Sequence, residues 1–533
     1  MTSENLPKRK RLVIHPFVFG CSAGLIILFV LFTLTNLDTA EAVFTTVKDG
    51  ITETFGWFLI LCVQGFLLFC IYLAFSRFGH IRVGGPGARP SYNRPAWFSM
   101  LFSAGMGIGL MFWSVAEPIT HFENPPVASG MDGDAAMRAM DLTFLHWGFH
   151  AWAIYAMVGL ALAYFCFNRG LPLTVRSVFY PLIGERIHGP VGNVIDTIAV
   201  VATLFGVATS LGFGVAQINA GLHLLFDVSV SPVVQMALIA IITAVATASV
   251  VSGLDKGIKR LSQFNLVAAV TLMLFLVLVG PSLFLFKGFV QNTGHYLQNL
   301  LTLGSWTEAY ARDANWQGNW TVFYWSWWIA WSPFVGMFIA RISYGRTVRE
   351  FILGVLVVPS VLTFVWISIF GGAAIYETLY VDTQIVEAVN ANMATALFEL
   401  LARYPAAAIT SLLAMLLVFV FFVTSSDSGS LVIDIITSGG NLNPPVAQRV
   451  FWAVSEGVVA AVLTVGGGLT ALQTASITTG LPFAIILVIM AWGLLKAFRE
   501  EMPALSHRAA RAHYDRDYDP DADDVDRSRE PKR

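Results

Sequence analysis

The stretch Asn319–Phe334 reads NWTVFYWSWWIAWSPF and holds five of the chain's fifteen tryptophans, at positions 320, 325, 327, 328 and 331. Tryptophans of membrane proteins usually gather at the two water interfaces. This run instead leads directly into an apolar segment that continues to Ile339. Taken alone, it fits an interfacial belt with helix packing as well as a buried aromatic site, where indole faces would hold a cation such as a quaternary ammonium.

The composition defines the class of protein. The chain has 533 residues, of which 56% are hydrophobic and 12% charged, with a mean hydropathy of +0.68. These values are typical of an all-α polytopic membrane protein. A net charge of -2 and a pI near 6.6 give no sign of nucleic-acid binding. The four cysteines lie in apolar stretches without CxxC spacing, so we expect neither a disulfide nor a metal cluster. No hydrolytic triad or phosphate-binding loop is present, so we expect neither an enzyme nor a cofactor.

Twelve apolar segments are long enough to cross a membrane of ~30 Å. They fall at roughly 13–35, 55–76, 96–116, 143–168, 190–224, 232–254, 263–286, 320–341, 348–374, 405–437, 446–468 and 474–498. Basic residues cluster after the second, fourth, sixth and eighth segments, and acidic residues in the alternate loops. By the positive-inside rule both termini are predicted to be cytoplasmic. The first segment follows Lys8–Arg11 without a cleavage site, so we interpret it as a retained helix.

Two segments are not predicted to span. Residues 289–303 form a moderately amphipathic stretch, which suits a helix lying along the outer interface. Residues 500–533 form a charged tail, with a helix expected at about 506–514 and disorder after it. The tail is either a solvated end or a regulatory arm at the cytoplasmic surface.

Two spans are predicted to be interrupted. Gly105, Gly107 and Gly109 lie at alternate positions within SAGMGIGL of the third span, and three weak helix formers favour a local break. Close helix packing is the alternative reading of these glycines. If the third to seventh spans repeat as the eighth to twelfth, the break corresponds to Trp331–Phe334, where Pro333 is expected to interrupt the helix. Interrupted helices at matching positions of two halves point to a transporter's binding site at the membrane midplane.

The tryptophan run, the glycine break, Glu117-Pro118 and FFVTSSDSGS at 421–430 together resemble the betaine/choline/carnitine transporter family. The resemblance covers the whole chain except the tail. It implies a LeuT-like fold, in which two extra helices precede a five-plus-five inverted repeat of helices 3–7 and 8–12, and a homotrimer in the bacterial cytoplasmic (inner) membrane. The implied segments are a cytoplasmic N-terminus at 1–12, two helices and a cytoplasmic loop at 13–95, the first repeat at 96–286, an interfacial helix and outer loop at 287–319, the second repeat at 320–499, and the tail at 500–533.

The resemblance also implies the substrate site. The family's aromatic box corresponds to Trp147, Trp152, Tyr155 and Trp328, with Trp327 and Trp331 flanking it along the permeation path. Trp152 and Tyr155 are three positions apart and so share one helical face. The glycine break contributes the remaining site residues, which are Gly105, Met106, Gly107 and Gly109.

Sodium is the coupling ion that the resemblance implies. Its site would combine carbonyls of Ser103 or Ala104, Met106 and Phe421 with the hydroxyls of Thr424 and Ser425. Alternatively, these hydroxyls bond back to their own helix. Neither 197–224 nor 263–286 contains a Lys or Arg that could replace the ion. A second sodium site is implied at Thr203 and Phe334, but Val207 and Ala330 stand where further hydroxyls are expected, so the number of ions stays open.

The expected function is therefore sodium-driven import of a betaine-like osmolyte for osmoprotection. A betaine is a zwitterion and needs no counter-anion, whereas choline carries an uncompensated charge. Family members that carry choline are expected to place an Asp at the position of Gly109, so this chain is predicted to prefer zwitterions. The alternatives are a proton-coupled choline transporter, a substrate exchanger, and a membrane sensor that detects osmolyte without transporting it. A sensor would need neither paired helix breaks nor an ion site.

Overall fold

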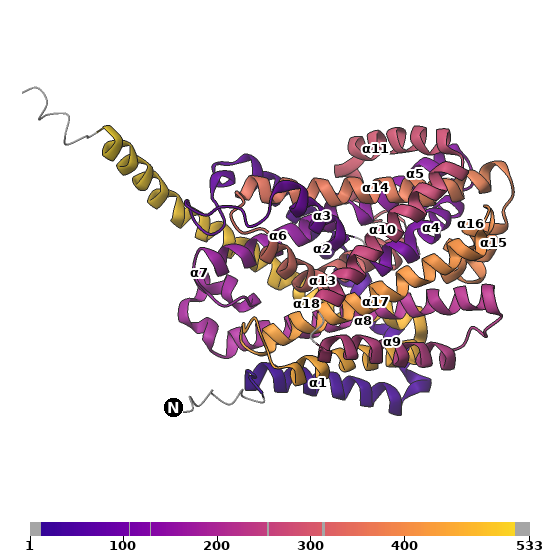
Figure 1. Cartoon of the computed structure of the whole chain (residues 1–533), viewed down its shortest axis with the longest axis horizontal. Coiled ribbons are helices and arrows are strands. Elements are labelled where there is room, and N and C mark those ends of the chain that lie inside the picture. Colours follow the sequence, from indigo (N-terminus) through magenta and orange to yellow (C-terminus); the bar gives the residue numbers. More distant parts are fainter. Residues whose placement is uncertain (1–11, 106, 128, 253–254, 312–314, 518–533) are drawn as a thin grey trace, which may run out of the picture.

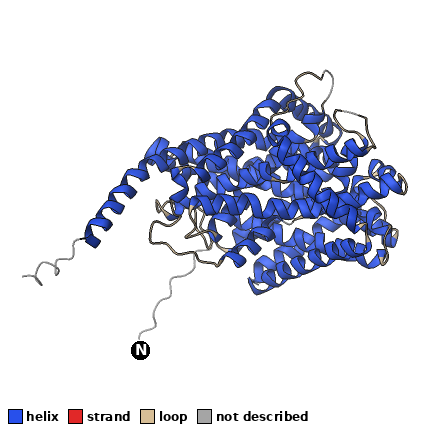
Figure 2. Ribbon diagram, turned by 90° about the horizontal axis from the view of Figure 1, so that it is seen from above, coloured by secondary structure: helices blue, strands red, loops and turns tan. Residues whose placement is uncertain are grey.

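The computed structural model describes residues 12–517 apart from 106, 128, 253–254 and 312–314. Within that part of the chain the fold is entirely helical, with no strand (Figure 2). The longer helices are α1 (Pro16–Thr35), α2 (Leu37–Phe75), α3 (Arg94–Gly105), α4 (Ile108–Glu123), α5 (Gly133–Trp147), α6 (Phe149–Phe167), α8 (Pro190–Phe226), α9 (Pro232–Ser252), α10 (Asp255–Val279), α11 (Ser282–Gly304), α13 (Thr321–Ile342), α14 (Val348–Tyr380), α17 (Ala407–Thr437) and α18 (Val446–Asp517). The shorter ones are η1 (Arg77–His80), η2 (Val175–Phe179), α7 (Tyr180–Ile183), η3 (Gly184–His188), α12 (Trp316–Asn319), α15 (Gln384–Ala391), η4 (Met393–Thr395) and α16 (Ala396–Ala402).

Nine helical stretches of the described chain are long and apolar enough to cross a membrane. They confirm an all-helical, multi-pass membrane protein. Three of the twelve predicted spans are not counted separately among the nine. The third is divided between α3 and α4, α13 carries many indole rings, and the last two are joined in one stretch, Val446–Met502. The number twelve and the inverted repeat stay predictions.

The predicted break in the third span is present and narrower than expected. α3 ends at Gly105 and α4 begins at Ile108, with Gly107 in extended backbone as its N-cap. The sequence predicted that Gly109 belongs to the break. In the structure Gly109 lies inside the first turn of α4 and is not part of the break. Met106 lies outside the described residues.

The predicted interruption at Pro333 is wrong, because α13 continues through it without non-helical backbone. Proline lacks the N–H that would bond the carbonyl four residues earlier, which is that of Ile329. The Ser332 hydroxyl donates to this carbonyl over 2.7 Å. The neighbouring side chain therefore supplies the missing donor, and the helix persists.

α13 lies near the middle of the bundle (Figure 1) and packs against α6, α8 and α18. α18 turns at Gly467 and Gly468, whose φ angles of 157° and 55° are ones that side chains rarely adopt. This turn falls at the predicted junction of the last two spans. The start of α1 and the end of α18 lie toward the same end of the bundle in both views (Figures 1 and 2).

The two segments not predicted to span are also helical in the described chain. α11 contains the amphipathic stretch 289–303, and His295 on it lies 2.5 Å from the Asp141 carboxylate on α5. The helical part of the tail is longer than expected, because α18 continues to Asp517. Residues 518–533, where disorder was predicted, lie outside the described residues.

Candidate functional site

A cavity lies between α4, α5, α6, α8, α13, α14 and α17. Its wall includes all six aromatic residues expected at the site. The complete lining is Gly107, Ile108, Gly109, Leu110, Trp147, Ala151, Trp152, Tyr155, Ser210, Trp327, Trp328, Trp331, Thr363 and Ser425. The structure thus brings together residues more than 300 positions apart in the sequence.

Most of the aromatic rings around this cavity meet at steep angles, and one pair is stacked. Trp327 and Trp328 are stacked, with centroids 4.6 Å apart and an interplanar angle of 15°. Trp147 meets Trp328 edge-on at 4.9 Å and 71°. Tyr155 lies 5.4 Å from Trp152 and 6.3 Å from Trp328, again nearly perpendicular. Rings at steep angles can surround a trimethylammonium group from several sides, which is the geometry of an aromatic cage.

Hydrogen bonds fix three of these indoles. Trp328 donates from Nε1 to the His146 carbonyl over 2.8 Å, and Trp147 donates to a Glu117 carboxylate oxygen over 2.8 Å. Trp327 donates to the Gly206 carbonyl on α8 over 3.3 Å. Each indole has few rotatable bonds, so one hydrogen bond suffices to fix its orientation. Three indoles of the wall are therefore held in place before a ligand enters.

The N-terminus of α4 faces the cavity through Gly107, Ile108, Gly109 and Leu110. The first amides of a helix have no partner within the helix and carry the positive end of its dipole. Such a terminus attracts an anionic group, including a carboxylate. The cavity therefore joins an aromatic wall suited to a cation with a helix end suited to an anion.

Two further donors are available in the wall. The Tyr155 hydroxyl and Trp331 Nε1 are buried and have no hydrogen-bond partner among the described residues. Unpaired buried donors are costly unless a ligand or water occupies them. Both can donate a hydrogen bond to a polar group of the ligand.

The residues expected to bind sodium are only partly gathered. Ser425 lines the cavity beside Gly107 and Gly109. Thr424 donates back to its own helix, to the carbonyls of Val420 at 2.9 Å and Phe421 at 3.2 Å, as the alternative reading had it. On α3, Ser103 is exposed and the backbone of Ala104 is helical, while Met106 is not described. Of the two hydroxyls expected at this site, that of Ser425 belongs to a residue of the cavity wall and that of Thr424 is bonded within α17.

The residues implied at a second sodium site, Thr203 and Phe334, lie on α8 and α13, two helices that pack against each other. Thr203 donates to the Ala199 carbonyl of its own helix over 2.7 Å. Phe334 packs edge-on against Trp331 at 5.2 Å. The hydroxyl of Thr203 is thus already engaged within α8.

Sequence reasoning missed several residues of the wall. Ser210, Thr363 and Ala151 line the cavity, yet nothing in their local sequence sets them apart. Glu117 and His146 were missed as supports of the box, although a buried ionisable residue next to a membrane span is a signal for function. Asp427, an ionisable residue within a membrane span, pairs with Arg449 of α18 at 2.8 Å.

Comparison with known proteins extends over nearly the whole chain. A family model described as betaine/carnitine/choline family transporter matches residues 17–503. The chain is 46% identical to the glycine betaine transporter of Acinetobacter baylyi, over 91% of this chain and 74% of that protein. It is 46% identical to a glycine betaine/proline/choline transporter of Vibrio parahaemolyticus, over 93% of this chain and 92% of that protein. It is 41% identical to the high-affinity choline transport protein of Escherichia coli, over 92% of this chain and 73% of that protein.

Proposed function

This chain belongs to the betaine/carnitine/choline transporter family, and we propose that it is a secondary symporter that imports a zwitterionic quaternary-ammonium osmolyte with sodium. As a member of that family it is a multi-pass membrane transporter of betaine- and choline-type solutes, not an enzyme. The observation that carries the proposal is the cavity in which tryptophan faces lie opposite the N-terminus of α4.

A zwitterion suits both ends of this cavity. Its trimethylammonium group has no N–H to donate and is held by ring faces, each contributing about 0.5–2 kcal/mol. Three or four such contacts supply much of the ~8 kcal/mol that micromolar binding requires. Its carboxylate would accept from the first amides of α4, and from the Tyr155 hydroxyl or Trp331 Nε1.

Sodium coupling rests on the family resemblance and on two oxygen atoms of α17, the hydroxyl of Ser425 and the carbonyl of Phe421. A sodium ion moving inward down 100 mV releases about 2.3 kcal/mol, which supports roughly fiftyfold accumulation of a neutral solute. Hard oxygen ligands suit this ion. The lack of Lys and Arg within 197–224 and 263–286 argues against an exchanger that replaces sodium with a positive side chain.

The proposal is tested by uptake of labelled glycine betaine into liposomes that contain the purified protein. Sodium and proton gradients are imposed separately, and labelled choline is compared under each. Uptake driven by sodium alone supports the proposal. Uptake that follows the proton gradient, or exchange without either gradient, would assign the protein to one of the alternatives. Binding without any uptake would make it a sensor.

The hydroxyls of α17 give a prediction on ion affinity. Ser425→Ala is expected to raise the sodium concentration for half-maximal uptake about tenfold, because one ligand oxygen near the cavity is lost. A tenfold change corresponds to ~1.4 kcal/mol of binding free energy. Thr424→Ala is expected to act in the same direction and less strongly, because its hydroxyl already bonds to Val420 and Phe421. Uptake is measured against sodium concentration, and an unchanged sodium dependence in the double variant would remove the assigned site.

The absence of an acid at Gly109 gives a prediction on selectivity. Glycine betaine, proline betaine and ectoine are expected to compete with labelled glycine betaine at least about tenfold better than choline, since a cation without a counter-anion is costly to desolvate. Competition in the unmutated protein measures this directly. Choline that competes as well as the zwitterions would contradict the prediction.

We propose the same family architecture for the rest of the molecule. It consists of twelve spans, with an inverted repeat of helices 3–7 and 8–12, both termini in the cytoplasm, and a homotrimer in a bacterial inner membrane. The helix break between α3 and α4 and the basic loops on one side support this arrangement. Cross-linking in native membranes and labelling of cysteines placed at both ends of the chain would test it.

A further inference from the structure

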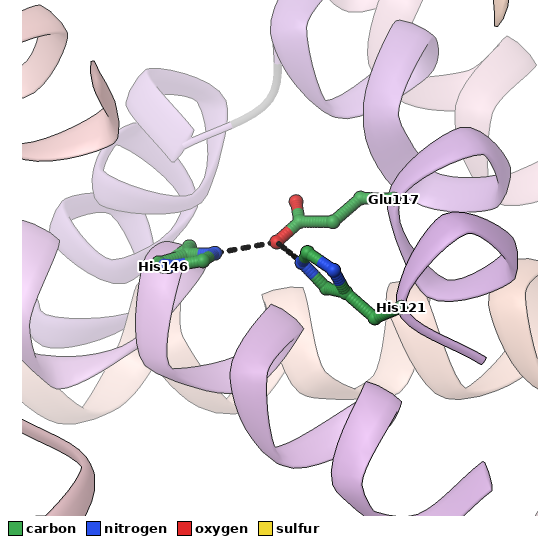
Figure 3. A group of neighbouring side chains, drawn as sticks. All are labelled: Glu117, His121 and His146. Carbon is green, nitrogen blue, oxygen red and sulfur yellow. Dashed lines mark hydrogen bonds and ion pairs between the residues drawn. The ribbon is translucent and has the colours of Figure 1, made fainter. Parts of the chain in front are cut away.

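A buried carboxylate, Glu117, accepts a hydrogen bond from Trp147 of the aromatic box. Figure 3 shows Glu117 with His121 and His146. Glu117 extends from α4 toward His121 of the same helix and His146 of α5, and all three side chains are fully buried. His146 Nδ1 lies 2.6 Å from Oε1, and His121 Nε2 lies 3.3 Å from the same oxygen. The other oxygen, Oε2, accepts from Trp147 Nε1 at 2.8 Å and from the Tyr324 hydroxyl at 2.5 Å.

This set of partners is that of an ionised carboxylate. The indole and the phenol both donate to it, and hydrogen bonds of this kind favour the charged form. His146 Nε2 lies 3.0 Å from the Thr321 hydroxyl, so both ring nitrogens of His146 have hydrogen-bond partners. Among the described residues, two histidines and no Lys or Arg lie within ion-pair distance of Glu117.

The three side chains could also be read as a metal site, since their ligand atoms all lie within 4.8 Å of one another. Metal–ligand bonds of about 2.0–2.2 Å would place ligand atoms roughly 3 Å or more apart. The 2.6 Å between His146 and Glu117 is instead the length of a hydrogen bond. Oε2 is already occupied by two donors as well. The contacts within the cluster are those of a hydrogen-bond network.

The cluster is connected to the box at two points. Glu117 holds the Trp147 indole directly, and His146, which it also binds, provides the carbonyl that accepts from Trp328. Both tryptophans line the cavity. One carboxylate therefore orients two walls of the box and places a negative charge behind them.

We propose that Glu117, as a carboxylate that accepts from Trp147 and Tyr324, is a positioning and specificity residue that sets how well the cavity accepts a net cation such as choline. This inference rests on the proposed function, since it concerns the same cavity. A fixed charge outside the lining attracts any quaternary ammonium. For choline the attraction is uncompensated, whereas a betaine's own carboxylate offsets most of it. Glu117 thus gives choline the residual affinity that a site without an acid at Gly109 would otherwise lack.

The test compares three ligands by binding to the purified, full-length protein at saturating sodium, followed by tryptophan fluorescence. They are choline, glycine betaine and 3,3-dimethylbutan-1-ol, the neutral isostere of choline. In Glu117→Gln, the Kd of choline is expected to rise about tenfold, which corresponds to ~1.4 kcal/mol. The Kd of glycine betaine should rise less than about threefold, and that of the alcohol should be unchanged, because only the charge has been removed.

Two further variants separate charge from architecture. Glu117→Asp keeps the charge and shortens the reach, so overall affinity is expected to fall while the ratio of choline to betaine affinity stays within about twofold. Glu377→Gln is the matched control, since this buried carboxylate on α14 accepts from the Tyr404 hydroxyl at 2.9 Å and does not line the cavity. It should leave all three Kd values as they are.

An equal loss for all three ligands in Glu117→Gln would overturn the proposal, because it would assign the residue a purely structural role. Complete loss of binding with helical content retained would overturn it in the same way. If Glu117→Gln does not fold, the test rests on Glu117→Asp. A larger loss of affinity for choline than for glycine betaine in that variant would overturn the proposal. These outcomes are independent of the proposed function, which fails instead if the unmutated protein does not bind betaine or takes it up without sodium.

Discussion

Gly109→Ala is expected to weaken the binding of glycine betaine by one to two orders of magnitude. A Cβ added at this position would lie 2.7 Å from Trp327 Cη2 and 3.0 Å from Trp147 Cη2. Neither ring can easily give way, because Trp327 is stacked on Trp328 and Trp147 is bonded to Glu117. Overpacking of this kind typically costs about 1–3 kcal/mol. The backbone of Gly109 is helical, so alanine is excluded here by space and not by conformation.

The measurement is the Kd of glycine betaine by titration of tryptophan fluorescence. Gly65→Ala is the matched control, because Gly65 also lies inside a helix, α2, where a Cβ would meet nothing within 4 Å. It should leave the Kd unchanged. Wild-type affinity in Gly109→Ala would mean that the two indoles are mobile. For the same reason Gly109→Asp is not expected to give a site selective for choline. Its Cβ would already collide with Trp327 and Trp147, whatever the position of the carboxylate.

Trp328→Leu is expected to raise the Kd of glycine betaine about thirtyfold, or ~2 kcal/mol. The substitution keeps an apolar side chain and removes the ring face that meets Trp147 and Tyr155 around the cavity. It also removes the donor to the His146 carbonyl, which leaves a buried acceptor unpaired. Both effects act on the same wall of the box, so affinity should fall more than loss of a single ring face would predict.

Trp325→Leu on the same helix is the matched control for this variant. Trp325 is fully buried, stacks on His150 at 5.6 Å and does not line the cavity. Its replacement is expected to lower the thermal stability of the protein and leave the Kd within about threefold of wild type. Equal losses of affinity in the two variants, measured by the same titration, would show that the tryptophans act by packing and not as a cation site.

The amino-acid sequence by itself determined the class of the protein and much of its local structure. The length and spacing of the apolar segments predicted a multi-pass helical membrane protein, because a bilayer requires every backbone polar group to be paired within its own helix. The three glycines predicted the break between α3 and α4, since weak helix formers act through their own backbone. The tryptophan run and the other motifs indicated the family, which the comparisons confirm.

Pro333 shows where local rules were incomplete. The rule that proline interrupts a helix was applied correctly, but Ser332 satisfies the carbonyl that proline leaves free. Gly107 and Gly109 show the same limit. A Cβ at Gly107 would meet nothing within 4 Å, whereas one at Gly109 would strike two indoles. Both are glycines in one short motif, and only their neighbours in space distinguish their roles.

The tertiary structure alone decided which residues share the cavity and what stands behind it. Trp327, Trp328 and Trp331 face the cavity, whereas Trp320 and Trp325 of the same run do not. Helical periodicity separates these faces, but the packing of α13 against α6 and α8 determines which face meets the site. Glu117 takes its partners from positions 29 and 207 residues away along the chain. Such contacts between distant segments depend on how the helices pack together, and that packing is not encoded in any single stretch of sequence.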